Sequence, residues 1–174
     1  MKYYLAPLEG ITTYIYRRAY HQHFAPMDKY FTPFLVPHTK KGFSTKEKND
    51  VMPEHSPGMN LVPQIMSNQA DSFLHTVEKL KVYGYEEVNL NLGCPSGTVT
   101  GKNKGAGLLR QPELLRQLLD GIFDALPDMK ISVKTRIGWE WAEEWPALLA
   151  LLETYPICRL TVHPRVRTQF YKGT

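Results

Sequence analysis

The sequence predicts an α/β fold, and more specifically a (β/α)8 TIM barrel of which about six of the eight strands are present. The first observation is that short β-type segments alternate with segments whose apolar residues recur at helical spacing. The second is that several strands carry apolar residues on one face and polar residues on the other. The alternation is typical of parallel sheets, and the polar face favours a barrel over an open sheet that helices cover on both sides.

The expected strands follow one another along the whole chain. They lie near Tyr3–Pro7, Lys29–Phe34, Leu61–Met66, Glu87–Leu92, Ile131–Thr135 and Arg159–His163. Helices are expected around residues 15–20, 73–80, 114–123 and 141–152. Pro112 suits the first turn of the third helix, and Gly84 suits the chain reversal after the second, whose N-cap we place at Ser67 or Asn68.

Polar residues share one phase at the carboxyl ends of four strands. In the segment EVNLNLG, apolar residues alternate with Asn89 and Asn91, and Gln64, Lys134 and His163 occupy comparable positions in other strands. Inward residues at these strand ends surround the site of a barrel enzyme. We therefore expect Gln64, Asn91, Lys134 and His163 to converge on the barrel mouth. The alternative is that each is a separate polar residue at the edge of a loop.

Composition limits the class of protein. The 174 residues are 43% hydrophobic, which is enough for one globular domain, and the net charge of +4 is weak evidence for a polyanionic partner. The sequence shows neither the apolar region of a signal peptide nor an apolar run of about 20 residues, so we expect a cytoplasmic protein without a membrane partner. We also expect no metal partner. Cys94 and Cys158 cannot form a disulfide framework, so Cys94 is either a small buried residue or a reactive thiol.

Five motifs carry a resemblance to a known family. They are APLEGITTYIYRR, PQI, NLNLGCPSGTVTGKNKGAGLL, VKTRIG and VHPR, at the first, third, fourth, fifth and sixth strands. In these motifs the chain resembles the tRNA-dihydrouridine synthases from residue 5 onward, and the string around Cys94 is the most specific of them. The resemblance implies a flavoprotein whose FMN, recharged by NADPH, reduces uridine in tRNA to 5,6-dihydrouridine.

The same resemblance implies the residues that contact the cofactor. They are Pro7, Leu8, Glu9, Gln64, Lys134 and His163. Gln64 would form a hydrogen bond with the isoalloxazine, and His163 would reach the flavin or its phosphate. Lys134 would lie near the N1/O2 edge, where a fixed cation stabilises the anion of reduced flavin.

The substrate side is expected to centre on Cys94. The resemblance implies that hydride reaches uracil C6 and that the thiol protonates C5, since a pKa of about 8.5 keeps a cysteine protonated at neutral pH. Asn91 and Arg165 would address the uracil edge, and Lys102 and Lys104 would attract tRNA phosphates. The basic residues of the strand-to-helix loops are Lys40, Lys41, Lys46, Lys48, Lys102, Lys104, Arg165, Arg167 and Lys172. The alternative is that these basic residues are only solvated loop residues without a phosphate partner.

The chain contains fewer strands than a complete barrel, which typically needs about 200 to 250 residues or more. We therefore interpret residues 1–174 as the N-terminal part of an FMN-binding catalytic domain. The resemblance implies a further part of the barrel and a helical tRNA-binding domain, neither of which is in this sequence. Two alternatives stay open: an FMN barrel that acts on a free pyrimidine, as dihydroorotate dehydrogenase does, and a non-catalytic RNA-binding remnant.

Overall fold

The structure is a computed structural model that describes residues 1–37 and 42–172. Its strands are all parallel, as the sequence predicts. They are β1 (Tyr4–Leu5), β2 (Lys29–Phe31), β3 (Leu61–Val62), β4 (Gln64–Ile65), β5 (Glu87–Leu92), β6 (Lys130–Arg136) and β7 (Arg159–His163).

Strands β3 and β4 are the two halves of the single strand expected at residues 61–66. Pro63 separates them, because a proline has no N–H to donate to a neighbouring strand. β3 pairs with β2 and β4 pairs with β5, while the carbonyl of Pro63 accepts a hydrogen bond from the Asn89 N–H at 2.8 Å. The two parts of the sheet are therefore joined through this strand.

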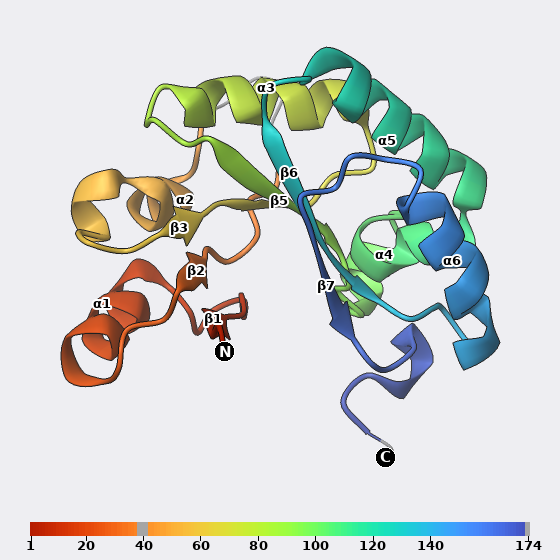
Figure 1. The fold of residues 1–174 in the computed structure, drawn as a ribbon, viewed down its shortest axis with the longest axis horizontal. Coiled ribbons are helices and arrows are strands. Elements are labelled where there is room, and N and C mark those ends of the chain that lie inside the picture. The colour runs from red at the N-terminus through yellow and green to blue at the C-terminus, as the bar shows by residue number, and fades with distance from the viewer. Residues whose placement is uncertain (38–41, 173–174) are drawn as a thin grey trace.

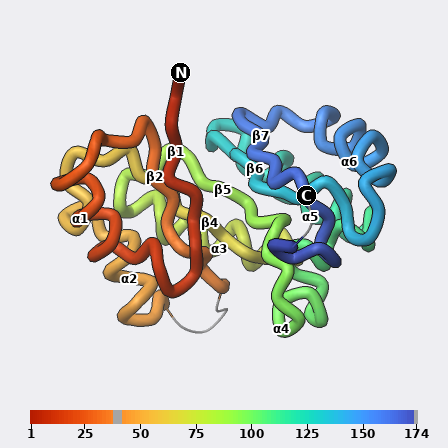
Figure 2. Tube along the Cα trace, turned by 90° about the horizontal axis from the view of Figure 1, so that it is seen from below, coloured from red at the N-terminus to blue at the C-terminus, as the bar shows by residue number. Residues whose placement is uncertain are grey.

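The described strands form a curved row whose two edges are open. Figure 2 shows β1 at one end of the row and β7 at the other, and in the described residues each pairs with one strand alone. The incomplete barrel that the sequence predicts is thus confirmed. At the amino-terminal strand ends, Glu87 forms ion pairs with Lys29 and with Arg159, and the Arg159 guanidinium lies 4.8 Å from the Tyr4 ring centroid. These contacts link β1, β2, β5 and β7 across the inner face.

Helices cover the outer face of the row. Figure 1 shows α3 and α5 lying along β5 and β6. The helices are α1 (Tyr14–His23), α2 (Thr45–Val51), α3 (Ala70–Lys81), α4 (Gly97–Thr100), α5 (Pro112–Ala125) and α6 (Trp145–Leu152), with short 3-10 turns η1 (Pro53–His55), η2 (Gly105–Arg110), η3 (Ala142–Glu144) and η4 (Arg167–Gln169). Pro112 begins α5 as expected, but Gln69 holds the N-cap position of α3, because Ser67 instead forms a local turn with Gln69.

The two faces of the strands differ as their alternation predicts. Leu90 and Val133 are completely buried in the apolar core, together with Phe73 of α3 and Leu118 of α5. The opposite face carries the polar side chains, and it lines the inside of the curved row. Because all strands run in one direction, their carboxyl ends meet at one end of this inner face.

Candidate active site

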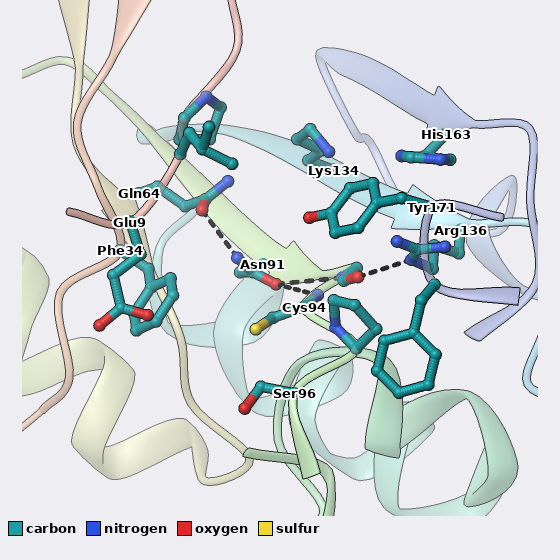
Figure 3. A pocket seen from close by; sticks show the side chains of 15 residues that line it. Glu9, Phe34, Gln64, Asn91, Cys94, Ser96, Lys134, Arg136, His163 and Tyr171 are labelled. Atoms are coloured by element: carbon teal, nitrogen blue, oxygen red, sulfur yellow. Dashed lines mark hydrogen bonds between the residues drawn. The ribbon is translucent and has the colours of Figure 1, made fainter. Parts of the chain in front are cut away.

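A cavity of about 360 Å³ opens at the carboxyl ends of the strands (Figure 3). Most of the site residues expected from the sequence line it: Pro7, Leu8, Glu9, Gln64, Asn91, Cys94, Lys134 and His163. They come from β1, β4, β5, β6 and β7 or from the turns that directly follow them. The convergence of Gln64, Asn91, Lys134 and His163 at one mouth is therefore a property of the structure, and they are not separate edge residues.

A chain of buried carboxamides forms the base of this pocket. Gln64 donates from Nε2 to Oδ1 of Asn89 at 2.7 Å and accepts at Oε1 from Nδ2 of Asn91, also at 2.7 Å. Asn89 in turn donates to the hydroxyl of Ser132 at 2.9 Å. A carboxamide has two N–H donors and two lone pairs, so Gln64 keeps one donor and one acceptor for a ligand.

Asn91 fixes the turn that carries Cys94. Its Oδ1 accepts hydrogen bonds from the backbone N–H groups of Gly93 and Cys94, each at 3.0 Å. Both lone pairs of that oxygen are engaged, and Nδ2 already donates to Gln64. The sequence predicts that Asn91 offers both a donor and an acceptor to a uracil edge. In the structure its acceptor is engaged, and one N–H donor is left for a ligand.

The Cys94 thiol is half-buried in the pocket wall between Asn91 and Ser96 (Figure 3). Burial raises the pKa of this thiol, and the carboxylate of Glu9 acts in the same direction. The backbone N–H of Ser96 and the charges of Arg136 and Lys134 oppose that rise in pKa without reversing it. The group is therefore protonated at neutral pH and lies beside donors that stabilise its thiolate.

Basic side chains outnumber acidic ones in the lining of the pocket: Lys134, Arg136 and His163 line it, and Glu9 is the one carboxylate among the lining residues that the structure describes. Burial and the charge of Arg136 lower the pKa of Lys134, and burial followed by the charges of Arg136, Lys134 and Arg165 lowers the pKa of His163. In the described part of the chain, neither Lys134 nor Arg136 forms an ion pair with a carboxylate. Such a pocket suits a ligand that carries or develops negative charge.

Arg136 belongs to the site although it was not among the expected residues. Its Nε donates to the Gly93 carbonyl at 3.0 Å and its Nη1 to the Val166 carbonyl at 3.1 Å, and its guanidinium lies 5.4 Å from the Tyr171 ring centroid. It thereby connects the Cys94 turn with the segment after β7. The sequence contained an indication of this role, because Arg136 lies two residues after Lys134 and therefore on the same face of the strand.

Three expected residues do not line the pocket. Lys102 and Lys104 lie on the loop between α4 and η2, and Lys104 is partly buried, which together with the charge of Lys102 lowers its pKa. Arg165 borders the pocket through His163, with 3.4 Å between Nη1 and Nε2. Of the remaining basic rim, Lys40 and Lys41 lie outside the described residues, and Lys46 and Lys48 are on α2.

The sequence of the chain matches the family described as Dihydrouridine synthase (Dus) over residues 4–174. The chain belongs to the dihydrouridine synthase family. It is 27% identical over 172 residues to a protein named probable tRNA-dihydrouridine synthase from Staphylococcus aureus, a match that covers 97% of this chain and 51% of that protein. A protein named probable tRNA-dihydrouridine synthase 1 from Synechocystis is also 27% identical, over 173 residues, with 97% of this chain and 46% of that protein covered.

Membership of the dihydrouridine synthase family confirms the resemblance and favours it over the dihydroorotate-dehydrogenase-like alternative. The chain spans about half the length of the curated relatives it matches. In residues 1–37 and 42–172, no helix is long and apolar enough to cross a membrane, and no three His, Cys, Asp or Glu side chains gather as a metal site.

Proposed function

We propose that this chain provides the catalytic part of an FMN-dependent enzyme that reduces uridine in tRNA to 5,6-dihydrouridine with NADPH as the source of electrons. Membership of the dihydrouridine synthase family and the names of the relatives support the reaction and the tRNA substrate. The observation that carries the proposal is the position of the half-buried Cys94 thiol in a pocket that Lys134 and Arg136 also line. Burial raises the pKa of this thiol, which favours its protonated form.

The pocket residues fit a flavin. The volume of about 360 Å³ lies in the range of ligand pockets, and Pro7, Leu8 and Phe34 provide apolar surface for a planar ring. FMN supplies a hydride for uracil C6 when it is bound, and NADPH then replaces that hydride. Gln64 would hold the flavin with the donor and the acceptor that its contacts with Asn89 and Asn91 leave free. Lys134, which lines the pocket, would provide a positive charge. Glu9 and His163 also line the pocket and would contact the cofactor, His163 at the flavin or at its phosphate.

Cys94 completes the reduction from its side of the pocket. When hydride has been added at C6, the proton on Sγ moves to C5, the C5–C6 double bond becomes single, and the sulfur keeps the electron pair of the S–H bond. The resulting thiolate is stabilised by the Ser96 N–H and by the charges of Arg136 and Lys134. Asn91 holds the turn and offers its remaining N–H to a uracil carbonyl, and Arg165 provides a second donor. Lys102 and Lys104 attract the phosphates of the tRNA.

The first experiment is to purify the protein and record its visible spectrum, then to mix it with NADPH and tRNA that lacks dihydrouridine. We expect flavin absorption at about 450 nm, which is a property of the cofactor itself. We also expect that tRNA accelerates NADPH oxidation and that free uridine does not. Nucleosides from the treated tRNA should gain two hydrogens per modified uridine by mass. Acceleration by free pyrimidines alone would favour the dihydroorotate-dehydrogenase-like alternative, and tRNA binding without flavin would favour the RNA-binding remnant.

A further inference from the structure

Outside the pocket, the indole ring of Trp139 contacts two guanidinium groups. The guanidinium carbon of Arg110 lies 4.5 Å from the Trp139 ring centroid, and that of Arg167 lies 4.7 Å from the same centroid. Arg110 ends η2, Trp139 follows β6, and Arg167 begins η4 after β7. Segments that follow three neighbouring strands thus meet at Trp139, and we call these three residues the Trp139 surface.

The positive charges of the Trp139 surface have no carboxylate partner in the described residues. Arg110 donates to the Thr100 carbonyl at 3.2 Å and to Asn103 Oδ1 at 3.3 Å, and Arg167 donates to neutral oxygens as well. No ion pair of the described residues includes Arg110 or Arg167. Two like charges on one ring repel each other, and an anion on this surface would remove that cost.

Glu144, five residues after Trp139, is engaged by the backbone of its own loop. The carboxylate of Glu144 accepts hydrogen bonds from the backbone N–H groups of Trp139, Glu140 and Trp141, at 2.7 to 2.8 Å. Partial burial by itself raises the pKa of Glu144, but the three hydrogen bonds together outweigh this effect and lower that pKa. Glu144 therefore shapes the loop that contains Trp139, and in the described residues it forms no ion pair with Arg110 or Arg167.

The Trp139 surface borders the mouth of the pocket on the side of Cys94. Arg167 donates from Nε to the carbonyl of Pro95, the residue after Cys94, at 3.1 Å. The same guanidinium lies 4.8 Å from the ring centroid of Phe170, which lines the pocket. In Figure 2 the segment that contains α4 and the segment after β7 lie beside each other, in agreement with these contacts.

We propose that Arg110, Trp139 and Arg167 form a phosphate-binding surface for the RNA backbone that flanks the nucleotide in the pocket. This rests on the proposed function, because it is the entry of an RNA base that would bring neighbouring phosphates to this side of the mouth. Guanidinium groups bind phosphate oxygens with two parallel hydrogen bonds, and the indole keeps both groups in place by cation–π contact. Lys102 and Lys104 add positive charge on the adjoining loop.

The test measures the affinity of the purified protein for unmodified tRNA at several salt concentrations. Arg110→Gln should lower the slope of log K against log salt by about 1, since one phosphate contact is lost. The affinity lost between about 50 and 200 mM salt should then be about threefold smaller than in the parent. Lys130→Gln is the control, because it removes the same charge from an exposed position at the amino-terminal end of β6. An unchanged slope in Arg110→Gln, or an equal decrease in Lys130→Gln, overturns the proposal.

A second variant tests the proposal independently, in case Arg110→Gln does not fold. Trp139→Leu keeps every charge, so it should weaken tRNA binding severalfold while the salt slope stays that of the parent. Unchanged affinity in this variant also overturns the proposal, as does a parent protein that binds tRNA without salt dependence. The two hypotheses fail separately. If the protein forms dihydrouridine but the Arg110→Gln variant keeps the parental salt slope, the Trp139 surface alone is refuted. If the salt slopes change as expected but the protein forms no dihydrouridine in tRNA, the proposed function is refuted.

Discussion

The carboxamide oxygen of Asn91 accepts a hydrogen bond from the backbone N–H of Cys94 at 3.0 Å. The same oxygen accepts from Gly93, and the carboxamide nitrogen donates to Gln64. One side chain thus ties the proposed proton donor to the proposed flavin ligand.

Asn91→Ala should destabilise the protein by about 1–3 kcal/mol, because two partly buried N–H groups lose their acceptor. Urea unfolding measures this loss as a lower midpoint with an unchanged m-value. Asn60→Ala is the control, since Asn60 is exposed and its side chain donates one long hydrogen bond, 3.3 Å, to Asp28. Equal stability of the Asn91 and Asn60 variants would show that the turn does not depend on Asn91.

Cys94→Ala should keep FMN binding and the reduction of flavin by NADPH but slow dihydrouridine formation by about 10²–10⁴-fold, the usual effect of removing a general acid. Single-turnover measurements with tRNA separate these steps. Cys158→Ala should behave as the parent, because Cys158 is exposed and does not line the pocket. Parental turnover in Cys94→Ala would disprove the proton-donor role.

The same step should depend on pH in one direction. A thiol donates its proton only while it is protonated, so the rate of dihydrouridine formation should fall as pH rises through the pKa of Cys94. Burial raises that pKa, which places the fall above the ordinary cysteine value of about 8.5. A single-turnover rate that already falls between pH 6 and about 8 would contradict this assignment.

Lys134→Met should weaken FMN binding, because the pocket loses a charge-assisted contact worth about 1.5–3 kcal/mol, or roughly ten- to a hundredfold in affinity. It should also slow flavin reduction by NADPH, since the anionic ring loses its counter-charge. Fluorescence quenching and stopped-flow absorbance measure the two effects. Lys130→Met is a matched control on the same strand, exposed at its other end. Parental retention of FMN in Lys134→Met would exclude the proposed contact.

Gly105→Ala should disturb the Cys94 turn directly. Gly105 has φ +53°, and a Cβ built there lies 2.9 Å from Cβ of Cys94 and 3.0 Å from its carbonyl oxygen. We expect a loss of about 1–2 kcal/mol from the left-handed conformation, and slower dihydrouridine formation from displacement of the thiol. Gly97→Ala has no atom within 4 Å of the added Cβ and should change neither quantity. Parental stability in both variants would refute the close packing of Gly105 on Cys94.

The sequence by itself determined the strands and the end of the sheet at which the site lies. Alternation of apolar and polar residues places Leu90 and Asn91 on opposite faces, and parallel strands bring their carboxyl ends together, so Gln64, Lys134 and Cys94 meet without any knowledge of contacts. The division of one strand at Pro63 follows from its missing N–H.

Tertiary structure decided what periodicity does not encode. The direction of a loop depends on what it packs against, so the sequence could not show that Lys102 and Lys104 lie away from the pocket while Tyr171 lines it. Nor could it show that the oxygen of Asn91 is engaged by its own turn, or that Arg136 connects Gly93 with Val166. A hydrogen bond depends on the three-dimensional positions of its atoms, and segments that are distant in sequence acquire those positions only when the fold brings them together.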